Sequence, residues 1–325
     1  MHAILPAERE SPNPRLGDLP DPVSGPGEVL VAVKAAGLNH ADLLQLRGLY
    51  PPPAGESTIP GLECAGIVRE AEKGSPWQPG ARVMALVGGG AHATLAAIPA
   101  GQLMPIPDNL SFIEGAAIPE AGLTAWTNLV VEGRLAAGET VVVTGATGGM
   151  GSFAVQLARE LGARVLAAGR SRERLELLRG VGVEEICVEG ANLARQVREA
   201  TGGRGADLVM DLTGGPEINS HLGALAEGGR LVLVGLVSGR QAEVDLGMIL
   251  SRRLRVVGSV LRPRPREEKA RLTTAFAEFA LPRLRDGRLR PVVDRVFPLE
   301  RAAEAYKAFE RGGAFGKIIL DMDGG

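Results

Sequence analysis

The feature that most constrains the fold of this 325-residue chain is a glycine-rich turn in its middle. An apolar segment ends at Thr144, Gly145, Gly148 and Gly151 follow in a GxxGxxG spacing, and a helix-forming stretch begins at once. Glycines permit a tight turn and the close approach of a pyrophosphate, and the N–H groups and positive end of the new helix attract phosphates. A tight turn without a ligand is the alternative. The strand, helix and following strand stand where the motif requires them, which favours dinucleotide binding.

Strands and helices alternate strictly around this turn. The segments between the predicted strands carry apolar residues at helical spacing, and most end in glycine. The predicted strands are Val141–Thr144, Arg164–Ala168, Glu185–Val188, Leu208–Leu212, Arg230–Gly235 and Arg255–Val260. Continuous apolar strands that alternate with helices predict a parallel sheet covered on both faces, which is a doubly wound α/β domain.

The flanking parts of the chain have a different texture. Up to about Pro119, short β-like runs are separated by Gly and Pro clusters, which predicts a mostly β domain. Its one convincing helix is NHADLLQLRG, where Asn39 can act as the cap. After Leu261 come a long helix and a last strand, FGKIILDM. We therefore expect domains at 1–119 and 120–261, with the tail, about 262–325, packing back on the first domain.

Composition excludes several classes of protein. The 36 Lys and Arg against 38 Asp and Glu leave a net charge of −2, which gives no reason to expect a nucleic-acid or anionic-membrane partner. Apolar runs stop far short of the roughly 20 residues that span a bilayer. The two cysteines form neither a disulfide framework nor a four-ligand zinc site. These features predict a cytoplasmic protein in a reducing compartment.

The end of the second predicted strand indicates the cofactor. An NAD site places Asp or Glu there to bind the ribose hydroxyls, but this chain has Gly169 followed by Arg170. Arg170, Ser171 and Arg174 can converge on a 2′-phosphate, and the planar fork of arginine suits that group. The alternative is a solvated helix face for Arg172 and Arg174. The pattern predicts NADPH rather than NADH.

Nearly the whole chain resembles the medium-chain dehydrogenase/reductase superfamily, and within it the zinc-free quinone oxidoreductase branch, which includes zeta-crystallin. The similarity is strongest to the subgroup of the quinone oxidoreductase that a tumour suppressor induces. It rests on AAGLNHADLLQLRGLYPPP, IPGLECAGIV, GQLMPIPDNLSFIEGAAIPEAGLTAW, GATGGMG, VVGSVLRPR, RPVVDRVFPLERAAEAY and FGKIIL. The resemblance implies a GroES-like catalytic domain interrupted by a Rossmann domain.

Two positions bear on zinc. Zinc-dependent members of the superfamily have Cys where Asn39 stands and His where Leu62 stands, and they carry a four-Cys lobe that this chain lacks. Asn39 and Leu62 offer neither thiolate nor imidazole, so we expect no metal. Without a metal to polarise the acceptor, an activated acceptor such as a quinone or an enone is the expected substrate. The resemblance implies NADPH-dependent hydride transfer to a quinone.

The resemblance also implies particular site residues. Asn39 and Thr124 are expected beside the nicotinamide, and Tyr50 as the catalytic group that positions or protonates the acceptor, although a packed loop tyrosine is an equal alternative. Asn39 is expected to take part in catalysis as well. The other expected cofactor contacts are Thr147, Gly148, Gly149, Met150, Gly151, Arg170, Ser171, Arg174, Gly235, Leu236, Ser259, Leu261 and Lys317. His92 and Glu189 depart from the residues common in the family. His92 is a weaker candidate proton donor, with a surface or loop histidine as the alternative.

Other functions remain open from the sequence. The same hydride geometry serves an NADPH-dependent enone or enoyl-thioester reductase, and relatives used as lens crystallins suggest a non-catalytic NADPH-binding protein. The apolar strand RVVGSVL closes one edge of the predicted sheet, and an unpaired apolar edge favours pairing with a second copy. We therefore expect a homodimer.

Overall fold

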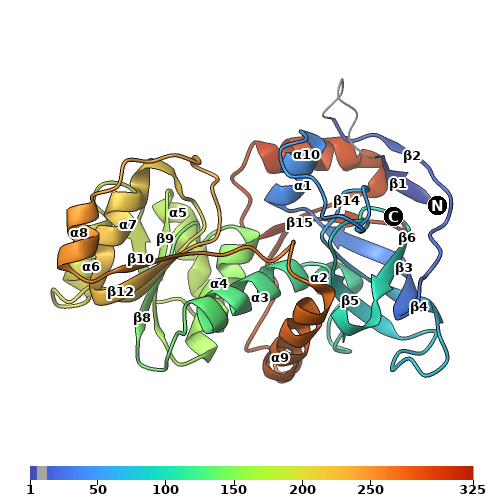
Figure 1. Ribbon diagram of the computed structural model, residues 1–325, viewed down its shortest axis with the longest axis horizontal. Helices are drawn as coiled ribbons and strands as arrows, with labels where there is room; N and C mark the ends of the chain where they lie inside the picture. The colour runs from blue at the N-terminus through green and yellow to red at the C-terminus, as the bar shows by residue number, and fades with distance from the viewer. Residues whose placement is uncertain (6–12, 325) are drawn as a thin grey trace. The chain divides into compact units, whose positions relative to one another are not determined.

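The computed structural model describes residues 1–5 and 13–324, and they form two compact units. Unit 1 comprises Met1–Leu123, Leu261–Gly287 and Pro291–Gly325. Unit 2 comprises Thr124–Val260 with the short return Arg288–Arg290. Figure 1 traces both units by residue number. The chain therefore leaves its first unit twice, once for nearly all of the second unit and once for the three residues Arg288–Arg290.

Unit 2 is built on a six-stranded, wholly parallel sheet. Its strands are β8 (Thr140–Val143), β9 (Arg164–Gly169), β10 (Glu185–Val188), β11 (Ala206–Asp211), β12 (Leu225–Leu233) and β13 (Arg255–Gly258). They lie in the order β10-β9-β8-β11-β12-β13, which is the doubly wound arrangement with its reversal between β8 and β11. The predicted fold is confirmed.

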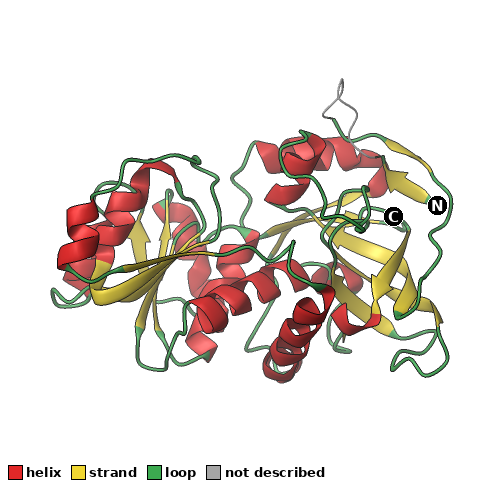
Figure 2. Cartoon of the chain, in the orientation of Figure 1, coloured by secondary structure: helices red, strands yellow, loops and turns green. Residues whose placement is uncertain are grey.

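Helices flank this sheet, as the red ribbons on either side of the yellow strands show (Figure 2). The helical segments are α4 (Gly149–Glu160), α5 (Arg172–Leu177), η3 (Leu178–Val181), α6 (Leu193–Ala200), η4 (Gly215–Glu217), α7 (Ile218–Ala224) and α8 (Leu246–Ser251). Strand side chains such as Val142, Leu166 and Leu231 are wholly buried against them. This burial explains the continuous apolar runs in the sequence.

Unit 1 contains a seven-stranded, mostly antiparallel sheet. Its strands are β3 (Glu28–Gly37), β4 (Glu63–Ala71), β5 (Arg82–Leu86), β6 (Leu95–Pro99), β7 (Leu103–Pro105), β14 (Val293–Pro298) and β15 (Lys317–Asp321). The order is β14-β15-β3-β4-β5-β7, with β6 also paired to β3. Because β15 pairs antiparallel with β3, the tail adds strands to the sheet of the first unit. A separate pair, β1 (His2–Ile4) and β2 (Leu16–Asp18), lies outside this sheet.

The helical segments associated with unit 1 are mostly short. They are α1 (His40–Leu46), η1 (Ala100–Gln102), α2 (Phe112–Gly115), α3 (Pro119–Trp126), which continues into the π-helical η2 (Thr127–Glu132) of unit 2, α9 (Arg266–Arg285), η5 (Leu299–Arg301) and α10 (Ala302–Glu310). Tyr306 of α10 and Ile98 of β6 are buried in the same core. No helix in residues 1–5 and 13–324 is long and apolar enough to cross a membrane.

Two local features differ from the sequence analysis. Strand β12 begins at Leu225, five residues before the predicted start, because Leu225 pairs with Ala206 ahead of a register shift. Helix α8 was not predicted, because its apolar residues Leu246 and Leu250 are exposed and give no core-facing pattern. Asn39 stands at the N-cap of α1, as predicted. The Asp42 carboxylate reaches back and accepts a hydrogen bond from the Asn39 N–H at 2.8 Å, as in a capping box.

Candidate functional site

The glycine loop of unit 2 leads from β8 into the first turn of α4. Gly145 has a φ of +59°, a backbone conformation that glycine adopts without strain. A Cβ at Gly151 would lie 2.3 Å from the Gly145 carbonyl oxygen, so only glycine fits there. Gly148 caps the twelve-residue helix α4 without any side chain, which leaves the first N–H groups of the helix open to a ligand. This cradle fits a pyrophosphate.

Three arginines follow β9 at the same edge of the sheet. Arg170, Arg172 and Arg174 are exposed, and their guanidinium groups have no hydrogen-bond or ion-pair partner among residues 1–5 and 13–324. The Ser171 hydroxyl accepts from the Arg174 N–H at 3.4 Å and caps α5. Arg170, Ser171 and Arg174 thus follow one another directly after β9, and the guanidinium groups of Arg170, Arg172 and Arg174 are alike in exposure.

An acidic side chain reaches into this region from the next strand. Glu189 follows β10, and its carboxylate accepts a hydrogen bond from the Gly145 N–H at 2.5 Å. The pKa of Glu189 is raised, chiefly by burial and also by the nearby Asp211 carboxylate. The Gly145 N–H, His221 and Arg170 oppose this rise. No local pattern indicated that Glu189 meets the glycine loop, because the two residues lie 44 positions apart.

The buried carboxylate of Asp211 holds several segments near the glycine loop by hydrogen bonds. Asp211, the last residue of β11, accepts from the N–H groups of Thr213 and Gly214 and bonds His221 Nδ1 at 2.9 Å. Its Oδ1 atom also accepts from the Thr144 hydroxyl at 3.2 Å. Burial alone raises the pKa of Asp211, but the bonds to His221 and to the backbone outweigh it, so the net pKa is lowered.

In unit 1, two of the predicted site residues meet in a buried polar cluster. The Lys317 ammonium donates to Asn39 Oδ1 at 2.6 Å and pairs with the Glu63 carboxylate. The Asn39 amide nitrogen donates to Glu63 Oε1 at 3.0 Å and to the Gly37 carbonyl at 3.3 Å. The second Glu63 oxygen accepts from the Glu120 N–H at 2.8 Å. These bonds fix the Asn39 side chain in one orientation.

His92 belongs to a second buried network in unit 1. Its Nδ1 atom bonds the Tyr306 hydroxyl at 2.8 Å and its Nε2 atom lies 3.2 Å from the Gly37 carbonyl. Asp42 Oδ2 lies 4.0 Å from the same Nε2 atom, and burial raises the pKa of Asp42. His92 lies in a loop, as one alternative held, but it is wholly buried rather than at the surface. Both ring nitrogens are engaged, which disfavours the proton-donor role.

Tyr50 lies over a guanidinium group. The Arg262 carbon Cζ stands 5.1 Å from the centre of the Tyr50 ring, within cation–π range. Arg262 also donates to the Tyr50 carbonyl at 3.1 Å, the Gly88 carbonyl at 2.8 Å and Gln45 Oε1. The Tyr50 hydroxyl has no partner in residues 1–5 and 13–324. Burial raises the pKa of Tyr50, so it is a protonated donor at neutral pH.

The other predicted contacts are distributed over both units. Gly235, Ser259 and Thr124 belong to unit 2, whereas Leu261 belongs to unit 1. Ser259 Oγ is buried without a partner within the described residues. A Cβ at Gly235 would lie 2.4 Å from the Leu212 carbonyl oxygen, so that glycine is required by packing. Leu236 is exposed.

The structure also bears on the metal and thiol chemistry. No group of three or more His, Cys, Asp or Glu side chains in the described ranges is arranged to hold a metal ion. Leu62 is buried beside Glu63. Cys64 is buried, and burial raises its pKa to about 12, which leaves the thiol unreactive.

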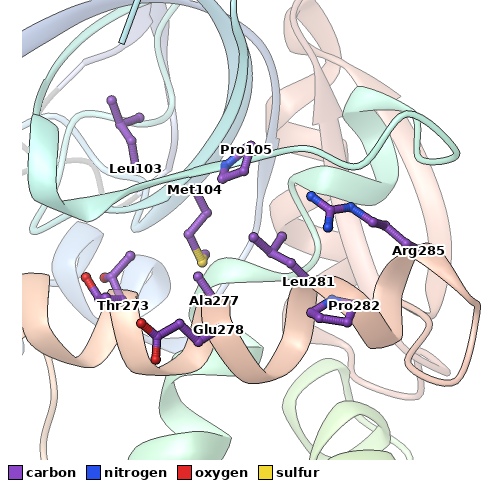
Figure 3. A pocket seen from close by; sticks show the side chains of 10 residues that line it. Leu103, Met104, Pro105, Thr273, Ala277, Glu278, Leu281, Pro282 and Arg285 are labelled. Atoms are coloured by element: carbon purple, nitrogen blue, oxygen red, sulfur yellow. The ribbon is translucent and has the colours of Figure 1, made fainter. Parts of the chain in front are cut away.

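A shallow groove runs between β7 and α9 in unit 1. Figure 3 shows Met104 and Pro105 on one side and Ala277 and Leu281 on the other. Among the described residues that line it, Glu278 and Arg285 are the ionisable ones. The groove holds no pair of groups suited to redox or acid–base chemistry, and we place no site in it.

Comparison with known proteins identifies the family to which the chain belongs. Residues 25–108 match the alcohol dehydrogenase GroES-like domain, and residues 149–278 match the zinc-binding dehydrogenase family. The quinone oxidoreductase of Sus scrofa is 31% identical over 309 residues, which cover 93% of this chain and 92% of that protein. The chain belongs to the medium-chain dehydrogenase/reductase superfamily.

Other relatives of this medium-chain dehydrogenase/reductase differ in size. The mycocerosic acid synthase-like polyketide synthase of Mycobacterium tuberculosis is 31% identical over 315 residues, which cover 92% of the chain but only 14% of the synthase. Among solved structures, the quinone oxidoreductase of Thermus thermophilus, also determined in complex with NADPH, is 37% identical with a TM-score of 0.83. That match covers 99% of this chain and all of the other.

An NAD-dependent alcohol dehydrogenase is 32% identical with a TM-score of 0.88, again over 99% of this chain and all of the other. The comparisons support a nicotinamide-dependent oxidoreductase.

Sequence reasoning missed several residues of these clusters. Glu63 stands next to Leu62, and Arg262 next to the predicted Leu261, so both lay within stretches that carried the resemblance. Gln45 carried no signal, because its partner Arg262 lies 217 positions away.

Proposed function

We propose that the chain is a zinc-independent NADPH:quinone oxidoreductase. The observation that carries the proposal is the Asn39 cluster. The family resemblance implies that Asn39 and Leu62 stand where zinc-dependent relatives have Cys and His. In the structure, the ammonium of Lys317 is bonded to Asn39 and Glu63. A cation supplied by the chain thus neutralises the buried Glu63 carboxylate, and the cluster offers neither thiolate nor imidazole.

The residues of unit 2 fit a phosphorylated dinucleotide. The open N–H groups at the start of α4 suit a pyrophosphate, and Arg170 and Arg174 suit a 2′-phosphate. When bound, the reduced nicotinamide supplies a hydride to the acceptor. The chain's own task is to hold the cofactor, orient the acceptor and exclude water.

The Tyr50 hydroxyl is the group we assign to the acceptor oxygen. Arg262 holds the Tyr50 ring and its backbone, so the hydroxyl has a fixed direction. Because burial raises the pKa of Tyr50, the hydroxyl can donate a hydrogen bond or a proton to the reduced acceptor at neutral pH. A quinone or an enone presents a carbonyl oxygen suited to that donor.

The test is a panel of acceptors with purified protein and NADPH. We expect NADPH oxidation with simple quinones such as 1,4-benzoquinone, unchanged after treatment with a metal chelator. Enones and enoyl thioesters complete the panel, because the similar segment of the polyketide synthases makes an acyl acceptor the second candidate. Faster turnover of an enoyl thioester would replace the quinone with that candidate. No turnover of any acceptor would leave an NADPH-binding protein, and stoichiometric zinc with loss of turnover on chelation would overturn zinc independence.

We also propose a cytoplasmic location. The free cysteines Cys64 and Cys187 are both buried, which suits a reducing compartment. Localisation of a tagged full-length chain by fractionation tests it.

A further inference from the structure

Glu189 crosses the carboxyl edge of the unit 2 sheet. In the strand order β10-β9-β8, β9 lies between the strand that precedes Glu189 and the strand that precedes Gly145. The Glu189 N–H donates to the Gly169 carbonyl at 2.9 Å, which fixes its backbone beside the end of β9. Its side chain then reaches over that end and bonds the Gly145 N–H at 2.5 Å. The carboxylate is thereby held in front of β9.

That position is where a ribose-binding acid acts in a doubly wound sheet. In NAD sites the acid stands at the end of the second strand, which here ends in Gly169 and has no side chain to offer. The Glu189 carboxylate reaches the same edge from the third strand. Only Oε1 has a partner, and Oε2 is left without a hydrogen bond to residues 1–5 and 13–324. A half-buried carboxylate oxygen without a donor is an acceptor site for a ligand hydroxyl.

We propose that Glu189 is a specificity-determining residue that accepts the adenosine ribose hydroxyls and opposes a 2′-phosphate. A 2′-phosphate carries close to two negative charges, and a carboxylate held nearby disfavours it by like-charge repulsion. Arg170 and Arg174 favour the same phosphate, so the balance of the two effects sets the preference between NADH and NADPH. The inference rests on the nicotinamide cofactor of the proposed function and not on its acceptor.

The test measures binding of nucleotide fragments, without turnover. Dissociation constants for 2′,5′-ADP and 5′-AMP are determined by calorimetry at pH 8 for the wild type, Glu189→Gln and Glu185→Gln. Glutamine keeps an oxygen for the Gly145 N–H but removes the charge. Glu185 is the first residue of β10, the strand that Glu189 follows, and it pairs with Arg164 in solvent, so it is the matched control.

We expect Glu189→Gln to shift the ratio of the two dissociation constants toward 2′,5′-ADP by about 10-fold or more, and Glu185→Gln to leave it within about twofold. Glu189→Ala is measured in parallel and shifts the ratio in the same direction even if the glutamine variant folds poorly. Arg170→Ala shifts the ratio in the opposite direction.

Two results overturn the inference. One is an unchanged ratio in both Glu189 variants, and the other is the absence of binding of either fragment, which would also overturn the cofactor assignment. Fragment binding with the expected shift but without quinone turnover overturns only the quinone proposal.

Discussion

At the scale of single residues, Arg262 shows how one side chain positions another. Its guanidinium is buried, donates to two carbonyls and an amide, and faces the Tyr50 ring. Burial lowers the pKa of Arg262, but the guanidinium stays charged because arginine is not deprotonated in proteins. Lysine cannot supply three directed bonds and a planar surface at once. Arg262 therefore acts through Tyr50 rather than on the acceptor.

We expect Tyr50→Phe to lower kcat for quinone reduction by about 10- to 1000-fold while the Kd for NADPH stays nearly unchanged. The Tyr50 hydroxyl has no partner in the described chain, so its removal breaks no hydrogen bond there and the melting temperature should hold. The other tyrosine provides the matched control. Tyr306→Phe removes a hydroxyl bonded to His92 in the core, so it should lower the melting temperature and spare kcat. Equal kcat values for Tyr50→Phe and the wild type would return Tyr50 to a packing role.

At the scale of elements, Asp211 joins β8, β11 and α7. It bonds Thr144 after β8, the backbone that follows β11, and His221 on α7. One buried carboxylate thus sets the positions of three segments around the glycine loop. Asparagine at this position would keep one acceptor oxygen for those donors but would remove the charge and replace the oxygen that bonds His221 Nδ1 by an amide donor, which is costly in a buried site.

We expect Asp211→Asn to lower the free energy of unfolding of unit 2 by about 3 kcal/mol at pH 7. The net pKa of Asp211 is lowered on folding, so its ionisation stabilises the fold above its unfolded pKa, near 3.8. That contribution is lost as the pH falls through the lower folded pKa. The difference in the free energy of unfolding between Asp211→Asn and the wild type should therefore become smaller below about pH 4. Urea titrations followed by Trp126 fluorescence in a Trp77→Phe background report the unfolding of unit 2. A difference in the free energy of unfolding that stays constant from pH 7 to pH 3 would contradict the stabilising role of the Asp211 charge.

Much of the element pattern could be predicted from the sequence, and the reasons are local. The strands of unit 2 are continuously buried, so β9 and β10 stand within a residue of their predicted ends. The glycine loop was also predictable, because the positive φ at Gly145 and the close backbone contact at Gly151 both require glycine, and glycine is visible in the sequence. The resemblance named Asn39 and Lys317, but not the Glu63 carboxylate between them. Contacts such as Gln45 with Arg262 and Glu189 with Gly145 depend on tertiary placement, which periodicity does not encode.

At the scale of the whole molecule, the free edge of the unit 2 sheet bears on assembly. Strand β13 is the last strand in the order and pairs only with β12 among the described residues. Val256 is about half exposed there. An exposed apolar edge strand offers unpaired N–H and C=O groups to a second strand. We propose that two copies pair through β13 about a twofold axis, which joins two six-stranded sheets into one.

The direction of the backbone groups in β13 gives a sharp test of this dimer. The Ser259 N–H donates to the Leu233 carbonyl of β12, so alternate residues face β12 and the Val256 N–H faces the free edge. Val256→Pro removes that outward donor and leaves the bonds to β12 in place, whereas Val256→Ala shortens the side chain and keeps the donor. Light scattering at micromolar concentration should then give a dimer for the wild type and Val256→Ala and a monomer for Val256→Pro, with all three folded by circular dichroism. A monomeric wild type, or a dimer that survives the proline, would show that β13 is not the pairing edge.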